Sequence, residues 1–181
     1  MISDIEIRPA TLFDLDGILK VSEIYIKETA SFTNNIADVT RYLRDYYSYS
    51  KLESELVREN TYFYIALKNK SIVAYMTLNE YDSRTLFLNN LDNYFQIQRL
   101  FSISEFRNES LYDEFLNIAI TKARDFKYKD IIIDLYENNK LDIDYFTKHG
   151  FDNFFEFDHK IGAMTRHNIV LKKNLLNLSV K

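Results

Sequence analysis

The residues with the clearest potential for chemistry lie in a short polar turn, residues 104–109, between two segments of regular pattern. Residues 94–103 before it have the composition of a β-strand, and residues 110–127 after it repeat apolar side chains at helical spacing. A helix N-terminus presents unpaired backbone N–H groups and the positive end of its dipole, and together these bind anions. A polar turn that opens a helix in this way predicts a ligand site.

The next segment of the chain indicates how this site is positioned. Residues 130–137 contain the run Ile131-Ile132-Ile133, which is typical of a strand covered on both faces. A helix between two buried strands forms a βαβ crossover, so the strands are expected to be parallel and their connection right-handed. In open α/β sheets, ligands bind beyond the carboxyl ends of such strands. We therefore expect the site near the polar turn.

The composition is that of an ordinary globular protein, and we expect one domain spanning residues 1–181. A net charge of -4 argues against a nucleic-acid partner. The chain has no cysteine, and its three histidines have no metal-ligand spacing, so no metal site is predicted. We find neither a signal-peptide pattern nor an apolar run of the roughly 18–20 residues that a membrane span needs. We expect a cytoplasmic protein without a membrane partner.

The remaining segments predict the order β-α-α-β-β-β-α-β-α-β-β. Thr11 followed by Asp14 is typical of a helix start. Residues 80–92 are expected to form a loop. The other expected elements are a strand at 5–7, a helix to about 27, one or two helices over 37–59, a hairpin of 62–67 and 72–78, a short helix ending near 150, and closing antiparallel strands at 154–159 and 167–171.

Three groups of residues have a familiar order and spacing. They are Ile7-Arg8-Pro9-Ala10-Thr11 with Asp14; Ile97, Leu100 and Ser102 followed by Glu105-Phe106-Arg107; and Asn139, Ile143, Phe146, Gly150 and Phe151. Together they resemble the GCN5-related N-acetyltransferase (GNAT) superfamily. The resemblance implies an α/β (α+β) fold with a mixed, mostly antiparallel central sheet and helices on both faces. Its parallel pair, residues 94–103 and 130–137, would splay apart at a cofactor notch.

The resemblance also implies an activity, the aminolysis of a thioester. Acetyl-CoA would be the cosubstrate, and its acetyl group would pass directly to a primary amine of a small molecule or a protein. Such a site needs a base or a water path, an N–H donor to the developing oxyanion, and an acid near the sulfur. The expected partner is the amine acceptor, and a homodimer is a further possibility.

The family pattern assigns roles to particular positions. The backbone of Leu100, Phe101 and Ser102 would position the thioester, and Asn139 would contact the pantetheine. Phe146 would lie beside the leaving sulfur. Proton transfer would run through water organised by Glu80 or Glu28, and Gln96 stands where a base is often found. The expected pyrophosphate-binding stretch is Arg107, Asn108, Glu109, Ser110, Leu111 and Tyr112.

Several of these positions depart from the family pattern. Ser110 and Tyr112 replace two small residues that let phosphate oxygens approach the backbone. Phe146 cannot donate a proton and Gln96 has no useful basicity. Tyr145 is adjacent to Phe146, but one residue turns the side chain by about 100° on a helix, so we expect it to point elsewhere. An alternative is therefore a catalytically impaired GNAT-like domain that acts as a binding or interaction module.

Ordinary structural roles also remain open for several of these residues. Arg107 fits a solvated turn as well as a phosphate contact, and Ser110 fits a helix N-cap as well as a ligand. Asn139 fits a helix start, and Gly150 fits a left-handed helix C-cap. The residues that fit either packing or the wall of an acceptor pocket are Tyr46, Tyr47 and Tyr49.

Overall fold

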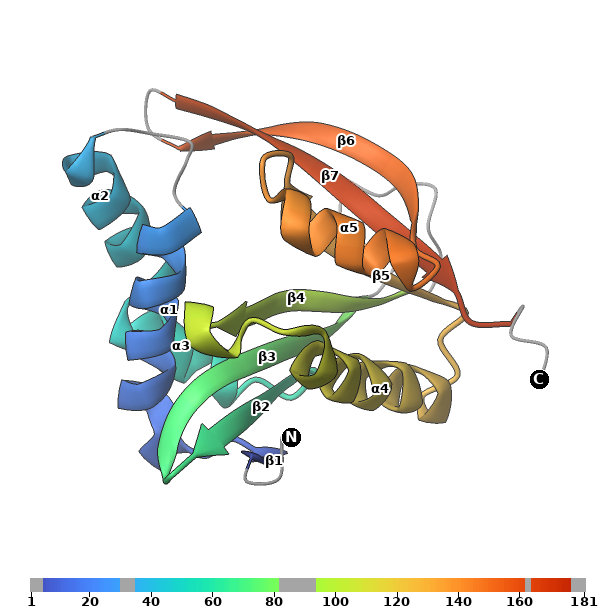
Figure 1. The fold of residues 1–181 in the computed structure, drawn as a ribbon, viewed down its shortest axis with the longest axis horizontal. Coiled ribbons are helices and arrows are strands. Elements are labelled where there is room, and N and C mark those ends of the chain that lie inside the picture. The colour runs from blue at the N-terminus through green and yellow to red at the C-terminus, as the bar shows by residue number, and fades with distance from the viewer. Residues whose placement is uncertain (1–4, 30–34, 82–93, 162–163, 177–181) are drawn as a thin grey trace.

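The computed structural model describes residues 5–29, 35–81, 94–161 and 164–176. It contains a seven-stranded sheet in the order β1-β2-β3-β4-β5-β7-β6 (Figure 1), in which β4 and β5 are parallel and the other neighbours antiparallel. The mixed, mostly antiparallel sheet predicted above is confirmed. The strands are β1 (Ile5–Pro9), β2 (Thr61–Lys68), β3 (Ser71–Tyr81), β4 (Tyr94–Ser102), β5 (Asp130–Tyr136), β6 (Asp152–Ile161) and β7 (Met164–Asn174).

The helices also follow the predicted order. The segment predicted as one or two helices contains two, which end by residue 56 and meet at Ser48, whose ψ of 157° is extended and breaks the helix. Gly150 follows α5 with a φ of 79°, as the predicted left-handed C-cap requires. Among the described helices, none is long and apolar enough to cross a membrane. The helices are α1 (Leu15–Thr29), α2 (Ile36–Tyr47), α3 (Tyr49–Leu56), α4 (Glu109–Asp125) and α5 (Lys140–Lys148), with short 3-10 turns η1 (Leu12–Asp14) and η2 (Ser104–Phe106).

Helices cover both faces of the sheet. On one face α1 and α3 pack on β2 and β3 through a cluster that includes Leu15, Ile18 and Tyr75. On the other face α4 and α5 share a larger cluster with β3, β4 and β5. Gly17 allows α1 to approach β3 closely, because a Cβ at that position would come within 2.5 Å of the Cδ1 atom of Ile72. The apolar stripes seen in the sequence thus become the contacts that hold the layers together.

The parallel strands separate partway along their length (Figure 1). Their pairing runs from Tyr94 opposite Asp130 to Ile97 opposite Ile133 and goes no further among the described residues. Gln98 is an extra residue in β4, since Ile97 and Arg99 pair with consecutive residues of β3, and such a bulge bends a strand. Residues 99–102 stay paired with β3, while residues 134–136 stay paired with β7. An opening therefore lies between the carboxyl ends of β4 and β5.

The start of α1 is fixed by a buried carboxylate. Asp14 accepts hydrogen bonds from the N–H and hydroxyl of Thr11 at 2.8 and 2.9 Å, as the capping pattern predicts. Both oxygens of Asp14 also accept from the Arg8 guanidinium at 2.8 Å. These hydrogen bonds, led by those from Arg8, lower the pKa of Asp14 to about 2 even though burial opposes the shift.

We predict that Asp14→Asn destabilises the protein by about 1–2 kcal/mol at pH 7, a value reduced for the partial exposure of Arg8. A carboxyl pKa lowered by folding adds stability above its unfolded value of about 4, and this stability is lost as the pH falls toward about 2. Chemical denaturation from pH 7 to pH 3 should show the gap between variant and wild type narrowing. Asp16→Asn, an exposed change in the first turn of α1, is the control. A gap that stays constant with pH would contradict this account.

Candidate functional site

Two cavities flank the opening between β4 and β5. We call the first the β7-side cavity; it has a volume of about 230 Å³ and lies among α1, α2, β4, β5 and β7. We call the second the α4-side cavity; it has a volume of about 250 Å³ and lies between the start of α4 and α5. The polar residues of the β7-side cavity include Gln98, Arg99, Asp134, Asn139, Arg166 and Asn168. The α4-side cavity is lined by Arg107, Asn108, Glu109, Tyr112, Leu141, Asp142, Asp144, Tyr145 and Lys148.

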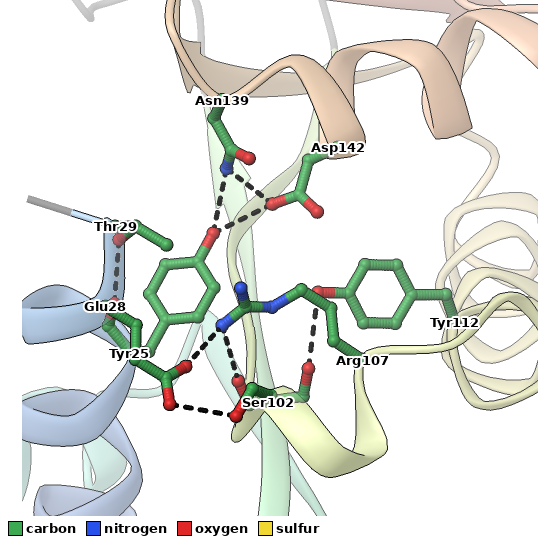
Figure 2. Close-up of polar contacts among 9 residues, drawn as sticks. Tyr25, Glu28, Thr29, Ser102, Arg107, Tyr112, Asn139 and Asp142 are labelled. Atoms are coloured by element: carbon green, nitrogen blue, oxygen red, sulfur yellow. Dashed lines mark hydrogen bonds and ion pairs between the residues drawn. The ribbon is translucent and has the colours of Figure 1, made fainter. Parts of the chain in front are cut away.

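A hydrogen-bonded bridge of Tyr25, Asn139 and Asp142 separates the two cavities. Figure 2 shows Tyr25 reaching from α1 toward the start of α5, where its hydroxyl donates to Asp142 Oδ2 at 2.8 Å. The Asn139 amide donates to the Tyr25 hydroxyl at 2.9 Å and to Asp142 Oδ2 at 2.6 Å. The ring of Tyr25 stacks on Phe101 of β4, with centroids 4.0 Å apart. This Tyr25 bridge ties α1 to α5 across the opening.

Burial sets the protonation of the bridge. It raises the pKa of Tyr25 well above the usual value for a phenol, and the neighbouring Asp142 carboxylate adds to the shift. Tyr25 therefore keeps its proton and donates it in the hydrogen bond. Burial also raises the pKa of Asp142, although the hydrogen bonds from Tyr25 and Asn139 and the charge of Arg107 oppose that shift. The bridge is thus a set of buried and half-buried polar groups that satisfy one another.

Arg107 lies beside the bridge in a fixed position. Its Nη2 atom donates to Glu28 at 2.9 Å and to the carbonyl of Ser102 at 3.1 Å (Figure 2). Its guanidinium carbon lies 4.9 Å from the ring centroid of Tyr25. Its buried Nε atom has no hydrogen-bond acceptor among the described residues. Arg107 is therefore an ordered group of the site, and the alternative of a solvated turn residue is wrong.

The first turn of α4 differs in detail from the prediction. Asn108 is the N-cap and accepts from the N–H of Leu111 at 3.1 Å, so the N-cap role proposed for Ser110 is wrong. Four backbone N–H groups of the predicted pyrophosphate stretch already have acceptors, those of Arg107, Asn108, Leu111 and Tyr112. Within the described part of the chain, only Glu109 and Ser110 of this stretch keep N–H groups without an acceptor. These two N–H groups can bind an anion.

The aromatic residues at the α4-side cavity also depart from the expectation. Phe146 is fully buried against Phe151 and lines neither cavity. Tyr145, which we expected to point elsewhere, lines the α4-side cavity and donates from its hydroxyl to Asp113 at 2.8 Å. Burial and Asp113 raise the pKa of Tyr145, so its proton is retained. Tyr112 is 3% exposed, and its hydroxyl lies 3.4 Å from Ser102 Oγ, so its bulk occupies the space between α4 and the end of β4.

The predicted catalytic residues are not brought together. Glu80 belongs to β3, not to a loop, and accepts hydrogen bonds from Tyr62 and Tyr128 at 2.5 and 2.9 Å. It pairs with Phe95 at the beginning of β4, away from the opening. Gln96 lies where β4 and β5 are still paired. Glu28 holds Arg107 beside the opening, but none of Glu28, Glu80 and Gln96 lines either cavity.

The backbone of β4 does reach the opening. Residues 98–102 have no strand partner on the β5 side among the described residues. Leu100 and Phe101 point to opposite faces, the first into the α4 cluster and the second onto Tyr25. The Ser102 carbonyl accepts from Arg107. An extended ligand could pair with this free edge as a further strand does.

The β7-side cavity contains polar residues that the sequence did not single out. Asp134 accepts from Asn168 at 2.7 Å, and Arg166 donates to the Tyr42 hydroxyl at 3.0 Å. Burial raises the pKa of Asp134, although Arg166 and Asn168 oppose the shift. The one sequence signal was Asp134 itself, a carboxylate directly after the apolar run of β5. Three tyrosines were expected either to pack or to line an acceptor pocket. Tyr46 and Tyr47 line this cavity and also pack with α1, and Tyr49 does neither.

The cavity wall beside β4 contains a buried ion pair. The Arg99 guanidinium donates to Glu55 of α3 at 2.5 Å, and both side chains are less than one-tenth exposed. Its carbon lies 5.1 Å from the ring centroid of Tyr47. Because buried charges are stable only when paired, Glu55 holds Arg99 in place in the wall of the β7-side cavity.

Solved structures with the same architecture come from distant organisms. PaiA N-acetyltransferase from Thermoplasma acidophilum, in complex with coenzyme A, has a TM-score of 0.75 and 18% identity, covering 94% of this chain and 99% of that chain. A probable acetyltransferase from Staphylococcus epidermidis has a TM-score of 0.71 and 20% identity, with 94% and 98% covered. Arabidopsis thaliana NAA60, in complex with a bisubstrate analogue, has a TM-score of 0.73 and 9% identity, with 94% and 97% covered. These similarities show a shared fold.

The sequence itself matches a family over more than half of its length. Residues 23–151 match the Acetyltransferase (GNAT) family. The matched region begins in α1, includes the Tyr25 bridge, Arg107 and the whole of the β4-α4-β5-α5 unit, and ends after α5. The chain therefore belongs to the GNAT family of acetyltransferases, which use acetyl-CoA as their acetyl donor.

Proposed function

We propose that this protein transfers the acetyl group of acetyl-CoA directly to a primary amine of a small molecule or a protein. The observation that carries the proposal is the separation of β4 and β5 after Ile97 and Ile133, with a cavity on each side of the resulting opening. Once the Tyr25 bridge moves aside, this arrangement lets a donor on the α4 side and an acceptor on the β7 side approach each other without a covalent enzyme intermediate.

Donors at the α4-side cavity and at the adjoining Ser110 fit a pyrophosphate. The N–H groups of Glu109 and Ser110 and the Nε atom of Arg107 are donors without acceptors in the described part of the chain. Lys148 lies at the rim, where it pairs with Glu109 at 2.8 Å. Donors at a helix N-terminus together with an arginine are well suited to phosphate oxygens. The backbone edge of Leu100–Ser102 would hold the pantetheine, and Asn139 would contact it from the start of α5.

The reaction is an attack of the amine nitrogen on the thioester carbonyl carbon. The C–N bond forms and the C–S bond breaks, the amine loses a proton, and the departing thiolate gains one. We assign the uptake of the amine proton to water at the opening. Tyr145 holds a proton at its hydroxyl on the donor side, and Glu28 positions Arg107.

The Tyr25 bridge also motivates a second candidate function. Tyr25, Asn139 and Asp142 lie between the two cavities, so donor and acceptor can meet only after these residues move. If the bridge never opened, the chain would be a catalytically impaired GNAT domain that acts as an interaction module. Measurements of cofactor binding separate the two functions.

The first prediction from the proposed function concerns acetyl-CoA itself. At 100 times its Kd, acetyl-CoA should stabilise the protein by about 2.7 kcal/mol and raise Tm by roughly 5–10 °C. Differential scanning fluorimetry with acetyl-CoA, CoA and ATP measures the effect, and a thiol-release assay with added amines follows transfer. The absence of a shift at millimolar acetyl-CoA would favour the interaction module.

The second prediction concerns Arg107. Arg107→Gln should weaken acetyl-CoA binding about 10- to 100-fold, because it removes charge-assisted hydrogen bonds to phosphate. Isothermal titration calorimetry measures the affinity. Arg124→Gln removes the same charge from an exposed position in the last turn of α4 and should have little effect. Equal affinities for the two variants would remove Arg107 from the donor site.

The third prediction concerns the bridge. Tyr25→Phe removes the hydroxyl that joins α1 to Asn139 and Asp142, so acetyl-CoA should bind about 2- to 10-fold more tightly. Tyr64→Phe is the control, since Tyr64 is a half-buried residue of β2 that lines neither cavity. Calorimetry on both variants gives the comparison. Weaker binding by Tyr25→Phe would mean that the hydroxyl contacts acetyl-CoA and does not hold the opening closed.

A further inference from the structure

The polar residues of the β7-side cavity lie on one face of two neighbouring strands. Tyr136 of β5 pairs with Asn168 of β7, and Asp134 and Arg166 each lie two residues from that pair. Side chains two residues apart point to the same face of a sheet. Asp134, Asn168 and Arg166 therefore face the cavity together, and all three line it.

These side chains leave hydrogen-bonding capacity unused. Asn168 is 5% exposed, and its buried Oδ1 atom has no donor among the described residues. The buried Nε atom of Arg166 likewise has no acceptor there, although Nη1 donates to Tyr42. Asp134 uses Oδ1 to accept from Asn168, and within the described residues no donor reaches its other oxygen. Buried polar atoms normally have partners, so Asn168 Oδ1 and Arg166 Nε point to a ligand that supplies one donor and one acceptor, and the second oxygen of the half-buried Asp134 can accept a further hydrogen bond.

We infer that the acceptor is a small amino acid-like molecule, whose carboxylate binds Arg166 and whose amine binds Asn168 Oδ1 and Asp134. This inference rests on the proposed acetyl transfer and adds the class of acceptor. A guanidinium binds a carboxylate through parallel N–H donors, and the ring of Tyr136, 5.1 Å from the guanidinium carbon, holds it flat. The amine is thereby directed to Asp134, the first residue of β5 beyond its last pair with β4, at the inner end of the opening.

Charge argues against a linear polyamine as the acceptor, and the size of the cavity argues against an acceptor as large as a drug molecule. A linear polyamine would place a second cation against Arg166. The volume of about 230 Å³ is below the roughly 300–1,000 Å³ typical of pockets for drug-sized ligands. Arg166 and Asn168 are two residues apart along β7, about 7 Å. A ligand that contacts both residues must therefore have its amine and its carboxylate only a few bonds apart.

The test compares matched acceptors on matched variants. Thiol release at saturating acetyl-CoA is measured with α-, β- and γ-amino carboxylates, with the same amines lacking the carboxylate, with an amino phosphonate and with a polyamine. Binding of each compound is measured separately by calorimetry. The variants are Arg166→Gln, Arg166→Lys and the control Arg44→Gln, which removes an exposed arginine of α2 outside both cavities. Thermal unfolding verifies that each variant is folded.

We expect an amino carboxylate to exceed its matched amine by at least about 10-fold in kcat/KM. Arg166→Gln should remove this preference by raising KM about 10- to 100-fold with kcat nearly unchanged, as expected for a lost charge-assisted contact. Arg166→Lys should restore part of the affinity, and Arg44→Gln should behave as wild type.

The outcomes distinguish this inference from the proposed transfer. Arg166-dependent binding of amino carboxylates without turnover would support the acceptor class and contradict the transfer. Equal use of amines without a carboxylate, or a preference that survives Arg166→Gln, would overturn the acceptor class and leave the transfer intact. A preference for the phosphonate or the polyamine, or no binding of any amino carboxylate, would also overturn it.

Discussion

The pairing of β5 with β7 beyond Ile133 is the constraint on which the rest of this structure depends. The last residues of β5 hydrogen-bond to β7, and the last residues of β4 hydrogen-bond to β3, so each strand keeps one neighbour and loses the other. The bulge at Gln98 turns β4 away at the same place. An edge of backbone groups inside a sheet would ordinarily invite a further strand. Here the aromatic pair of Tyr25 and Phe101 covers one side of it.

The chemistry around the opening follows from how buried polar groups are satisfied. Buried charges are stable only when they are paired or hydrogen-bonded, and Arg107 has Glu28 as its partner while Asp142 has Tyr25. The same rule identifies what is left over. Of the five buried side-chain nitrogen and oxygen atoms without a partner in the described part of the chain, three lie at the two cavities. Most of these unpartnered hydrogen-bonding atoms thus lie where ligands are proposed to bind.

The fold could be predicted from the sequence because its signals are local, but the site depended on contacts that the sequence does not display. Helix periodicity and the apolar run of β5 indicated the crossover, and the polar turn indicated Arg107. The N-cap was misplaced because Asn108 and Ser110 are both good caps and propensity does not choose between them. The phase of α5 decides whether Tyr145 or Phe146 faces a cavity, and one residue suffices to exchange them. Arg166 carries no local signal, since only the pairing of β5 with β7 brings it to the site.

The position of the Tyr25 bridge has a thermodynamic consequence. Tyr25 and Asn139 line the β7-side cavity and Asp142 lines the α4-side cavity, so one hydrogen-bonded group separates the two cavities from each other. In the proposed mechanism, whichever ligand opens the bridge supplies the free energy of opening, and the second ligand binds to a site that is already open. Linkage makes this effect reciprocal: each ligand raises the affinity for the other by the same factor. A closed bridge would therefore make the two substrates bind cooperatively, although they touch different helices.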